Sequence, residues 1–490
     1  MKVYFSDFFE VDPDIIEKYG AFNVSLINDL PLFIDPFLLF NSKKKIYQEL
    51  HENMLKYLRF LRDKSIEQHY MDEPLLKAWY CFPEIKQNWL GFSKNGNGGT
   101  GLGIDFAVDL HSNLNKLFAD FGDESITQTS HLEKLCLISE RAGRDHISNF
   151  TTRLINEFLL TYTEDFARKF LRSEYRKKVS VPYVRFNYTT EVWEPDIFEL
   201  PYIDGDWVML TPIDMLTKDE AWINKTDLYD NFEIISPSIP DEQLRAQVNN
   251  YFYMALKRDD NKQPTKPERN QAILDIVKKY PDIIDYYIKF KEDNGDKAEA
   301  QAQQKVEDSR ELYINNFSQL MDQLRLNTDF YKVSGDTYRE ALDRILFLKY
   351  VIEDCDGYRI FYIDGKPIKR EDDLQIMYRL TWYATSSDVN REVNNGRGPV
   401  DYKISRGSKD KTLVEFKLAS NTKIKRNLEK QVEIYSAANQ TKKAIKVILY
   451  FSENEFVKVN KILKELNLEG KEEIILIDAR NDNKPSASNA

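Results

Sequence analysis

The chain has 490 residues, of which 42% are hydrophobic and 30% charged, a composition typical of a globular protein of roughly two to four domains. Its net charge of −11 excludes nucleic-acid binding by a uniformly basic surface and leaves only a local basic face for that role. The sequence has no apolar run long enough for a transmembrane helix and no signal-peptide pattern at its start, so we expect a cytoplasmic protein without membrane contact.

Residues 1–255 are expected to form a large N-terminal α+β region with a sensing, recognition or oligomerisation role. Hydrophobic spacing of about 3.6 residues favours helices, and alternation favours strands. The expected elements are short strands at 23–27 and 32–35, helices at 45–62 and 147–171, a β-rich stretch at 178–201 and a buried strand at 207–212.

The loop Gly96–Gly101 within this region matches the pattern GxGxxG. A dinucleotide-binding fingerprint needs a strand before the loop, a helix after it and an acidic residue about 20 positions on. A helix is expected from Ile104, and Asp123 lies at a suitable distance, but the preceding strand would cover only residues 89–93. We therefore favour a flexible loop, with nucleotide or phosphate binding as the alternative.

Residues 256–326 are expected to be a helical connector, because a polar, proline-broken linker at 257–269 precedes a helical pattern. Residues 327–480 form the predicted C-terminal domain, and 481–490 a disordered tail. The expected elements of this domain are helices at 338–354 and 373–385, a hairpin at 358–368, strands around Asp401 and at 412–418, a helix containing Gln431 and a strand at 446–451.

The cysteines and histidines limit the metal chemistry that is open to the chain. Cys81, Cys136 and Cys355 are far apart and form no CxxC pair, and the five histidines show no HxH or HxxxH spacing. Neither a disulfide framework nor a cysteine zinc site is therefore expected. A bound metal is expected on carboxylates, which suit Mg²⁺ or Mn²⁺.

Two charged residues in the strand at 412–418 stand out, because they flank a core residue. Glu415 and Lys417 lie on either side of Phe416, and side chains two apart in a strand project from the same face. Asp401 lies in the preceding strand-like run. Two acids and an amine are thus expected at one place on a sheet; the alternative interpretation is a surface ladder of salt bridges.

These residue types fit phosphodiester hydrolysis, which needs a hard cation to polarise a phosphoryl oxygen and acidify a water molecule. Asp401 and Glu415 would be metal ligands, and Lys417 would orient or help to deprotonate the attacking water. Glu392, nine residues before Asp401, is placed to be a further metal or water ligand. Gln431 would hydrogen-bond the water or the scissile region.

The run Gly398-Pro399-Val400-Asp401, then Glu415-Phe416-Lys417, then Gln431 with Tyr435, resembles the PD-(D/E)XK (restriction-endonuclease-like) phosphodiesterase superfamily. The upstream glutamate and downstream QxxxY are similar to those of Holliday-junction resolvases and many prokaryotic defence nucleases. The usual proline directly before the aspartate is displaced here. The resemblance spans roughly residues 370–455. It implies an αβββαβ core, dependence on Mg²⁺ or Mn²⁺, and cleavage of DNA or RNA.

The sequence thus predicts a mixed, multidomain α/β protein whose C-terminal unit is a metal-dependent nuclease, with DNA as the expected substrate. A large partner region on a small nuclease is similar to bacterial anti-phage or restriction effectors, which implies a homo-oligomer and a partner defence protein.

Two other functions were weighed against the nuclease. One is a non-catalytic nucleic-acid-binding or assembly protein with a decayed nuclease fold, and the other is a nucleotide-binding regulatory protein that uses Gly96–Gly101. Lys423, Lys425, Arg426 and Lys430 form a basic cluster that would grip phosphates, or that alternatively is a solvated helix start.

Overall fold

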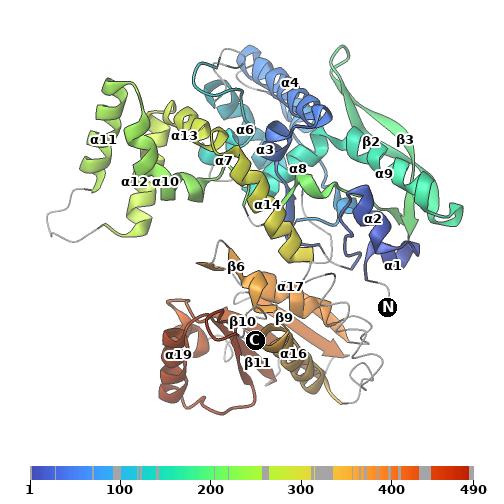
Figure 1. Cartoon of the computed structure of the whole chain (residues 1–490), viewed down its shortest axis with the longest axis vertical. Helices are drawn as coiled ribbons and strands as arrows, with labels where there is room; N and C mark the ends of the chain where they lie inside the picture. The colour runs from blue at the N-terminus through green and yellow to red at the C-terminus, as the bar shows by residue number, and fades with distance from the viewer. Residues whose placement is uncertain are drawn as a thin grey trace. The chain divides into compact units, whose positions relative to one another are not determined.

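The computed structural model divides into two compact units, one of Lys2–Phe92 with Gly99–Val306 and the other chiefly of Glu307–Ala490 (Figure 1). Both units mix helices and strands, as expected for an α/β protein. Among the described residues, no helix combines the length and the apolar character needed to cross a membrane. The structure describes residues 3–484 except 28, 69–70, 92–100, 118–120, 122–123, 139–142, 204, 219, 257–263, 311–313, 315–334, 356, 364–365, 369–371, 383–384, 386, 395–398, 407–409 and 430–442.

The first unit is mainly helical and carries two small antiparallel sheets. One sheet pairs β1 (Leu32–Ile34) with β5 (Leu216–Lys218), and the other consists of β2 (Arg176–Asn187), β3 (Val192–Ile203) and β4 (Asp206–Trp207). The helices are α1 (Phe5–Phe9), α2 (Pro13–Tyr19), α3 (Pro36–Asn41), α4 (Lys45–Glu67), α5 (Glu73–Trp79), α6 (Ile104–Leu117), α7 (Lys134–Ile138), α8 (Arg144–Leu154), α9 (Asn156–Phe170), α10 (Lys225–Ser238), α11 (Glu242–Leu256), α12 (Lys266–Lys279), α13 (Ile283–Glu292) and α14 (Gly295–Arg310).

The sequence predictions for this unit are confirmed for α4, β1 and the β2–β3 hairpin. The helix expected at 147–171 is two helices, because Ile155 leaves the helical conformation with ψ of 16°. The strand expected at 23–27 is wrong, since Ser25 forms only an isolated bridge with Tyr4. The strand expected at 207–212 is reduced to the end of β4, beyond which the chain stays buried without forming a regular strand.

A buried histidine–carboxylate hydrogen bond and a buried ion pair fasten α13 to the start of α7 and the segment before it. His131 Nε2 lies 2.9 Å from Glu292 Oε1, and both side chains are fully buried. Lys134 Nζ lies 2.6 Å from Asp285 Oδ1, with 2% of the lysine side chain exposed. Charged groups are seldom buried without such partners, so α13 is an integral part of this unit's core.

The second unit contains a five-stranded sheet in the order β12-β11-β10-β9-β8. Strand β9 pairs antiparallel with both of its neighbours, β8 and β10, whereas β10, β11 and β12 are parallel and therefore need crossover connections. The elements are α16 (Thr337–Asp354), the β6–β7 hairpin (Tyr362–Ile363 and Lys366–Pro367), α17 (Asp372–Leu380), β8 (Asp388–Asn394), β9 (Pro399–Arg406), β10 (Asp410–Leu418), β11 (Ala444–Tyr450), α19 (Glu453–Glu465) and β12 (Ile474–Asp478).

Helices cover both faces of this sheet, and Figure 1 shows α16 and α19 on opposite sides of the strands. On one face, the Tyr378 ring of α17 packs 5.1 Å from the rings of both Tyr402 and Phe416. On the other face, Val459 of α19 belongs to a core cluster with Ile448 of β11. Because strand side chains alternate, the neighbours of Phe416 in β10 project towards the α19 face.

A buried polar cluster joins α16 to the end of β9. The Glu340 carboxylate accepts hydrogen bonds from Arg344 Nη2 at 2.9 Å, from the Thr385 and Ser387 hydroxyls at 2.7 Å each, and from Arg406 Nη2 at 2.8 Å. Burial by itself raises the pKa of Glu340, but these hydrogen bonds outweigh it and hold the pKa below its usual value. The cluster fixes the position of α16 on the sheet.

Candidate active site

Asp401, Glu415 and Lys417 meet on the α19 face of the sheet. Antiparallel pairing of β9 with β10 brings Asp401 beside Glu415, and Lys417 follows two residues later on the same face. Lys417 Nζ lies 3.0 Å from Glu415 Oε1 and 3.7 Å from Asp401 Oδ2. The constellation expected from the sequence is therefore formed, and its side chains are largely buried, with 8% of Glu415 and 17% of the other two exposed.

The main chain of β10 holds the Asp401 carboxylate and the Lys417 ammonium in place. Phe416 N donates to Asp401 Oδ2 at 2.6 Å, which draws the carboxylate onto the neighbouring strand. Lys417 Nζ donates to Phe416 O at 2.9 Å as well as to Glu415. Asp401 and Lys417 are thus oriented by backbone groups of a central strand, which is more rigid than a loop.

The electrostatics of Glu415 are unusual for a surface salt bridge. Burial raises the pKa of Glu415 to about 7; Lys417 opposes the shift and Asp401 adds to it. Two neighbouring carboxylates in a poorly hydrated place repel each other, and a bound cation relieves that repulsion. Such strongly perturbed acids are more frequent at functional sites than elsewhere.

Asp401 and Glu415 offer hard oxygen ligands, so this pair fits Mg²⁺ or Mn²⁺, and Mg²⁺ usually keeps several water ligands beside one or two carboxylates. Within the described ranges, no set of three or more His, Cys, Asp or Glu side chains is gathered as a metal site. A metal ion on these two carboxylates would therefore need water molecules or residues outside the described set as its other ligands.

Of the two further residues of the predicted site, the structure describes the backbone of Glu392 but not Gln431. Glu392 lies within β8, not just after a helix as expected, and the register in which Val393 pairs with Val400 places its backbone opposite Asp401. Its position on the neighbouring strand agrees with the predicted proximity to Asp401. Gln431 lies outside the described residues, so its predicted role stays a prediction.

Sequence reasoning missed Lys446 on β11. Parallel pairing places Lys446 in register with Glu415, and only 8% of the lysine residue is exposed. It is the only charged residue in the run Ala444–Tyr450, a signal that was present in the sequence. Its significance depended on the register between β10 and β11, which the sequence does not reveal.

The basic cluster is only partly available for phosphate binding. Lys423 and Arg426 are exposed, but Lys425 Nζ pairs with Glu465 Oε2 of α19 at 2.7 Å. Lys430 lies outside the described residues. The prediction that Lys425 grips phosphate is therefore weakened, because an ion pair within the unit competes for its ammonium.

Of the Gly96–Gly101 loop, only Gly101 is described, and it has a packing role. Its φ is +65°, and a Cβ atom there would lie 2.6 Å from Glu84 N and from Phe82 O. The helix α6 follows at Ile104 as expected, and the described part of the expected preceding strand, residues 89–91, forms one bridge, between Leu90 and Leu30. Close backbone approach thus explains Gly101 without a nucleotide.

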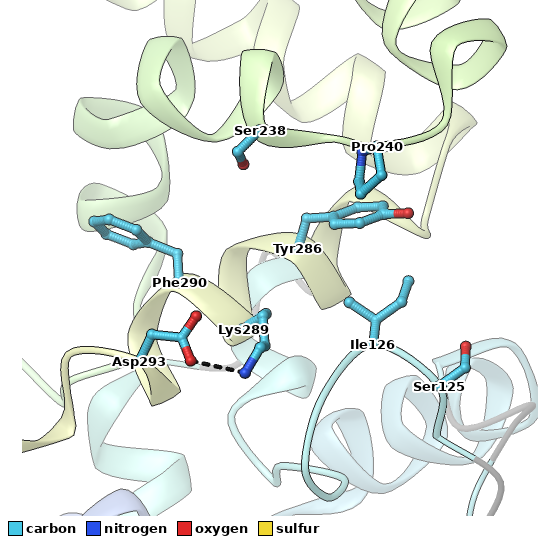
Figure 2. A pocket seen from close by; sticks show the side chains of 8 residues that line it. All are labelled: Ser125, Ile126, Ser238, Pro240, Tyr286, Lys289, Phe290 and Asp293. Atoms are coloured by element: carbon cyan, nitrogen blue, oxygen red, sulfur yellow. Dashed lines mark hydrogen bonds and ion pairs between the residues drawn. The ribbon is translucent and has the colours of Figure 1, made fainter.

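A pocket of about 430 Å³ in the first unit lies against α13 (Figure 2). Its two charged side chains neutralise each other, since Lys289 Nζ lies 2.7 Å from Asp293 Oδ1. We therefore assign it no catalytic role. Its lining residues are Ser125, Ile126, Ser238, Pro240, Tyr286, Lys289, Phe290 and Asp293.

Comparison with known proteins yields two family matches, one in each unit. Residues 10–224 match a family described as a domain of unknown function, DUF8370, and residues 337–453 match a second domain of unknown function, DUF8371. No curated protein and no solved structure matches the chain. The second match includes Asp401, Glu415, Lys417 and Lys446, so the candidate active site lies within one recurring domain.

Proposed function

We propose that the C-terminal unit is a metal-dependent nuclease that hydrolyses phosphodiester bonds, with DNA as the substrate. The observation that carries the proposal is the position of Lys417 Nζ within 4 Å of both the Asp401 and the Glu415 carboxylates, which belong to adjacent strands. A surface salt-bridge ladder would not need the burial of Glu415 or the raised pKa that accompanies it.

The residues would divide the chemistry among them. A Mg²⁺ ion on Asp401 and Glu415 would polarise a phosphoryl oxygen and acidify a water molecule. Lys417 would orient that water and offset the negative charge that builds up on the phosphate during attack. The oxygen of the water forms a new P–O bond as the P–O bond to the leaving oxygen breaks, and a proton lost by the water ends on the leaving oxygen. Glu392 is proposed as a further ligand of the metal or the water, and Gln431 as a hydrogen-bond partner of the water or the scissile region.

The chain order of the second unit supports the same proposal. Helix α17 is followed by the antiparallel strands β8, β9 and β10, then by a crossover with a helical stretch at 424–429, and then by the parallel strand β11. This order agrees with the αβββαβ core that the resemblance implies. We further propose a role in prokaryotic anti-phage defence, by analogy with proteins that join a small nuclease to a large partner region.

The proposal is tested by incubating the full chain with supercoiled plasmid, single-stranded DNA and RNA in Mg²⁺, Mn²⁺ or chelator. We expect cutting that needs a divalent cation and that falls at least about 100-fold in Glu415→Gln and in Lys417→Met. The matched control is Glu465→Gln, which neutralises an exposed carboxylate of α19. It should cut within about twofold of the wild type.

Three results would count against the proposal. Cleavage in the presence of chelator would contradict the role of the metal. Full activity of Glu415→Gln would contradict the role of the carboxylate pair. An equal loss in Glu465→Gln would show that general destabilisation, and not chemistry, causes the decline. Cleavage of RNA alone would change the substrate and leave the site assignment intact.

A further inference from the structure

Lys446 occupies an unusual place for a lysine. It lies on the central strand β11, where every other residue from Ala444 to Tyr450 is apolar, and only 8% of it is exposed. A methionine or leucine would fill that volume without the loss of hydration that a buried ammonium suffers. A buried ammonium needs a polar or negatively charged group nearby that compensates for the lost hydration.

Two partners are on hand. The ammonium of Lys446 donates a hydrogen bond to the carbonyl oxygen of Leu428, in the helical stretch 424–429 of the crossover. In the other direction, Lys446 is in register with Glu415, and its positive charge favours the ionised form of that carboxyl group. Residues paired across parallel strands project from the same face, so the Lys446 and Glu415 side chains are neighbours on the face against which Leu428 packs.

We infer that Lys446 is a positioning residue of the active site, which acts on the Glu415 carboxylate while it holds the crossover at the Leu428 carbonyl. This inference rests on the proposed function. One ammonium then sets the position of a proposed metal ligand relative to the helical stretch 424–429. Lys446 does not need to touch the substrate, in contrast to Lys417.

The chain offers a matched control in Lys458 of α19. Its Nζ also donates to a backbone carbonyl of the crossover, Ala419 O, at 3.0 Å. Lys458→Met therefore removes the same kind of lysine–carbonyl hydrogen bond on the same side of the sheet, but not a charge in register with Glu415. Comparing it with Lys446→Met separates fastening of the crossover from positioning of the carboxylate.

The experiment measures kcat and KM for plasmid cleavage and the thermal unfolding midpoint of the full-length variants. We expect Lys446→Met to lower kcat about tenfold to a hundredfold with KM within about twofold, because a misplaced ligand weakens the transition state more than binding. Lys458→Met should stay within about twofold of wild type in kcat. Lys446→Arg, which keeps the charge, should recover part of the lost kcat.

A second measurement does not depend on cleavage. The unfolding free energies of Lys446→Met, Glu415→Gln and the double variant form a double-mutant cycle. A double variant that departs from the sum of the single effects supports the link between Lys446 and Glu415; additive effects overturn it. Equal kcat losses in Lys446→Met and Lys458→Met also overturn it. Absence of cleavage by the wild type would refute the proposed nuclease. The double-mutant cycle would then still test the link between Lys446 and Glu415.

Discussion

At the scale of single residues, the burial of the Glu415 carboxyl group makes the stability of the fold depend on pH. In the folded chain its pKa is about 7, compared with an ordinary value of 4.5. The folded state therefore holds the proton more tightly than the unfolded state. The free energy of unfolding contributed by this group falls as pH rises from about 4.5 to about 7, and it changes little above that.

Glu415→Gln should consequently stabilise the metal-free protein at high pH. At pH 8 in chelator we expect its free energy of unfolding to exceed that of the wild type by roughly 1–3 kcal/mol, and at pH 4.5 we expect no such gain. Urea unfolding at the two pH values measures the difference. Added Mg²⁺ should stabilise the wild type only. Parallel stability profiles of the two proteins would contradict this prediction.

At the scale of elements, the placement of β9 depends on the buried carboxylate of Glu340, which binds α16 to the strand end at Arg406. Removing one partner of a buried charged cluster leaves the others without compensation. Only 8% of the Glu340 side chain and 2% of the Arg344 side chain are exposed. The Glu340 carboxylate thus contributes more to the stability of the second unit than an exposed acidic side chain on the same helix does.

Glu340→Ala should destabilise the second unit by about 3 kcal/mol or more. Asp343→Ala is the matched control, because Asp343 lies on the same helix and pairs with Arg339 at 3.2 Å while 46% of its side chain stays exposed. Its effect should be below about 1 kcal/mol. Limited proteolysis of folded protein measures both effects, and equal susceptibility of the two variants would contradict the role given to Glu340.

Local sequence patterns predicted some of the elements and side-chain positions of the candidate site but not others. The alternation around Phe416 is local, and it correctly placed Glu415 and Lys417 together. Strand β8 was not expected, because its polar residues form an edge strand that is stabilised by pairing with β9 and not by its own pattern. The position of Lys446 beside Glu415 likewise depends on pairing with residues about 30 positions away in the sequence.

At the scale of the whole molecule, the chain consists of two units with separate cores, and each contains one of the two family matches. Separate cores unfold as separate cooperative units unless a large apolar interface couples them. Calorimetry of the full chain should therefore show two transitions, of which Glu340→Ala lowers only one. A single transition that moves as a whole in Glu340→Ala would contradict independent unfolding.

The buried pairs of α13 have a practical consequence for anyone who shortens this protein. The first family match ends at residue 224, ahead of Asp285, which neutralises Lys134, and of Glu292, which forms a hydrogen bond with His131. A gene trimmed to that match would encode a polypeptide in which Lys134 lacks its counter-ion and helix α13 no longer covers the core. We expect this polypeptide to accumulate in inclusion bodies. A chain that ends after residue 306 keeps Asp285 and Glu292 and is the better choice for expression.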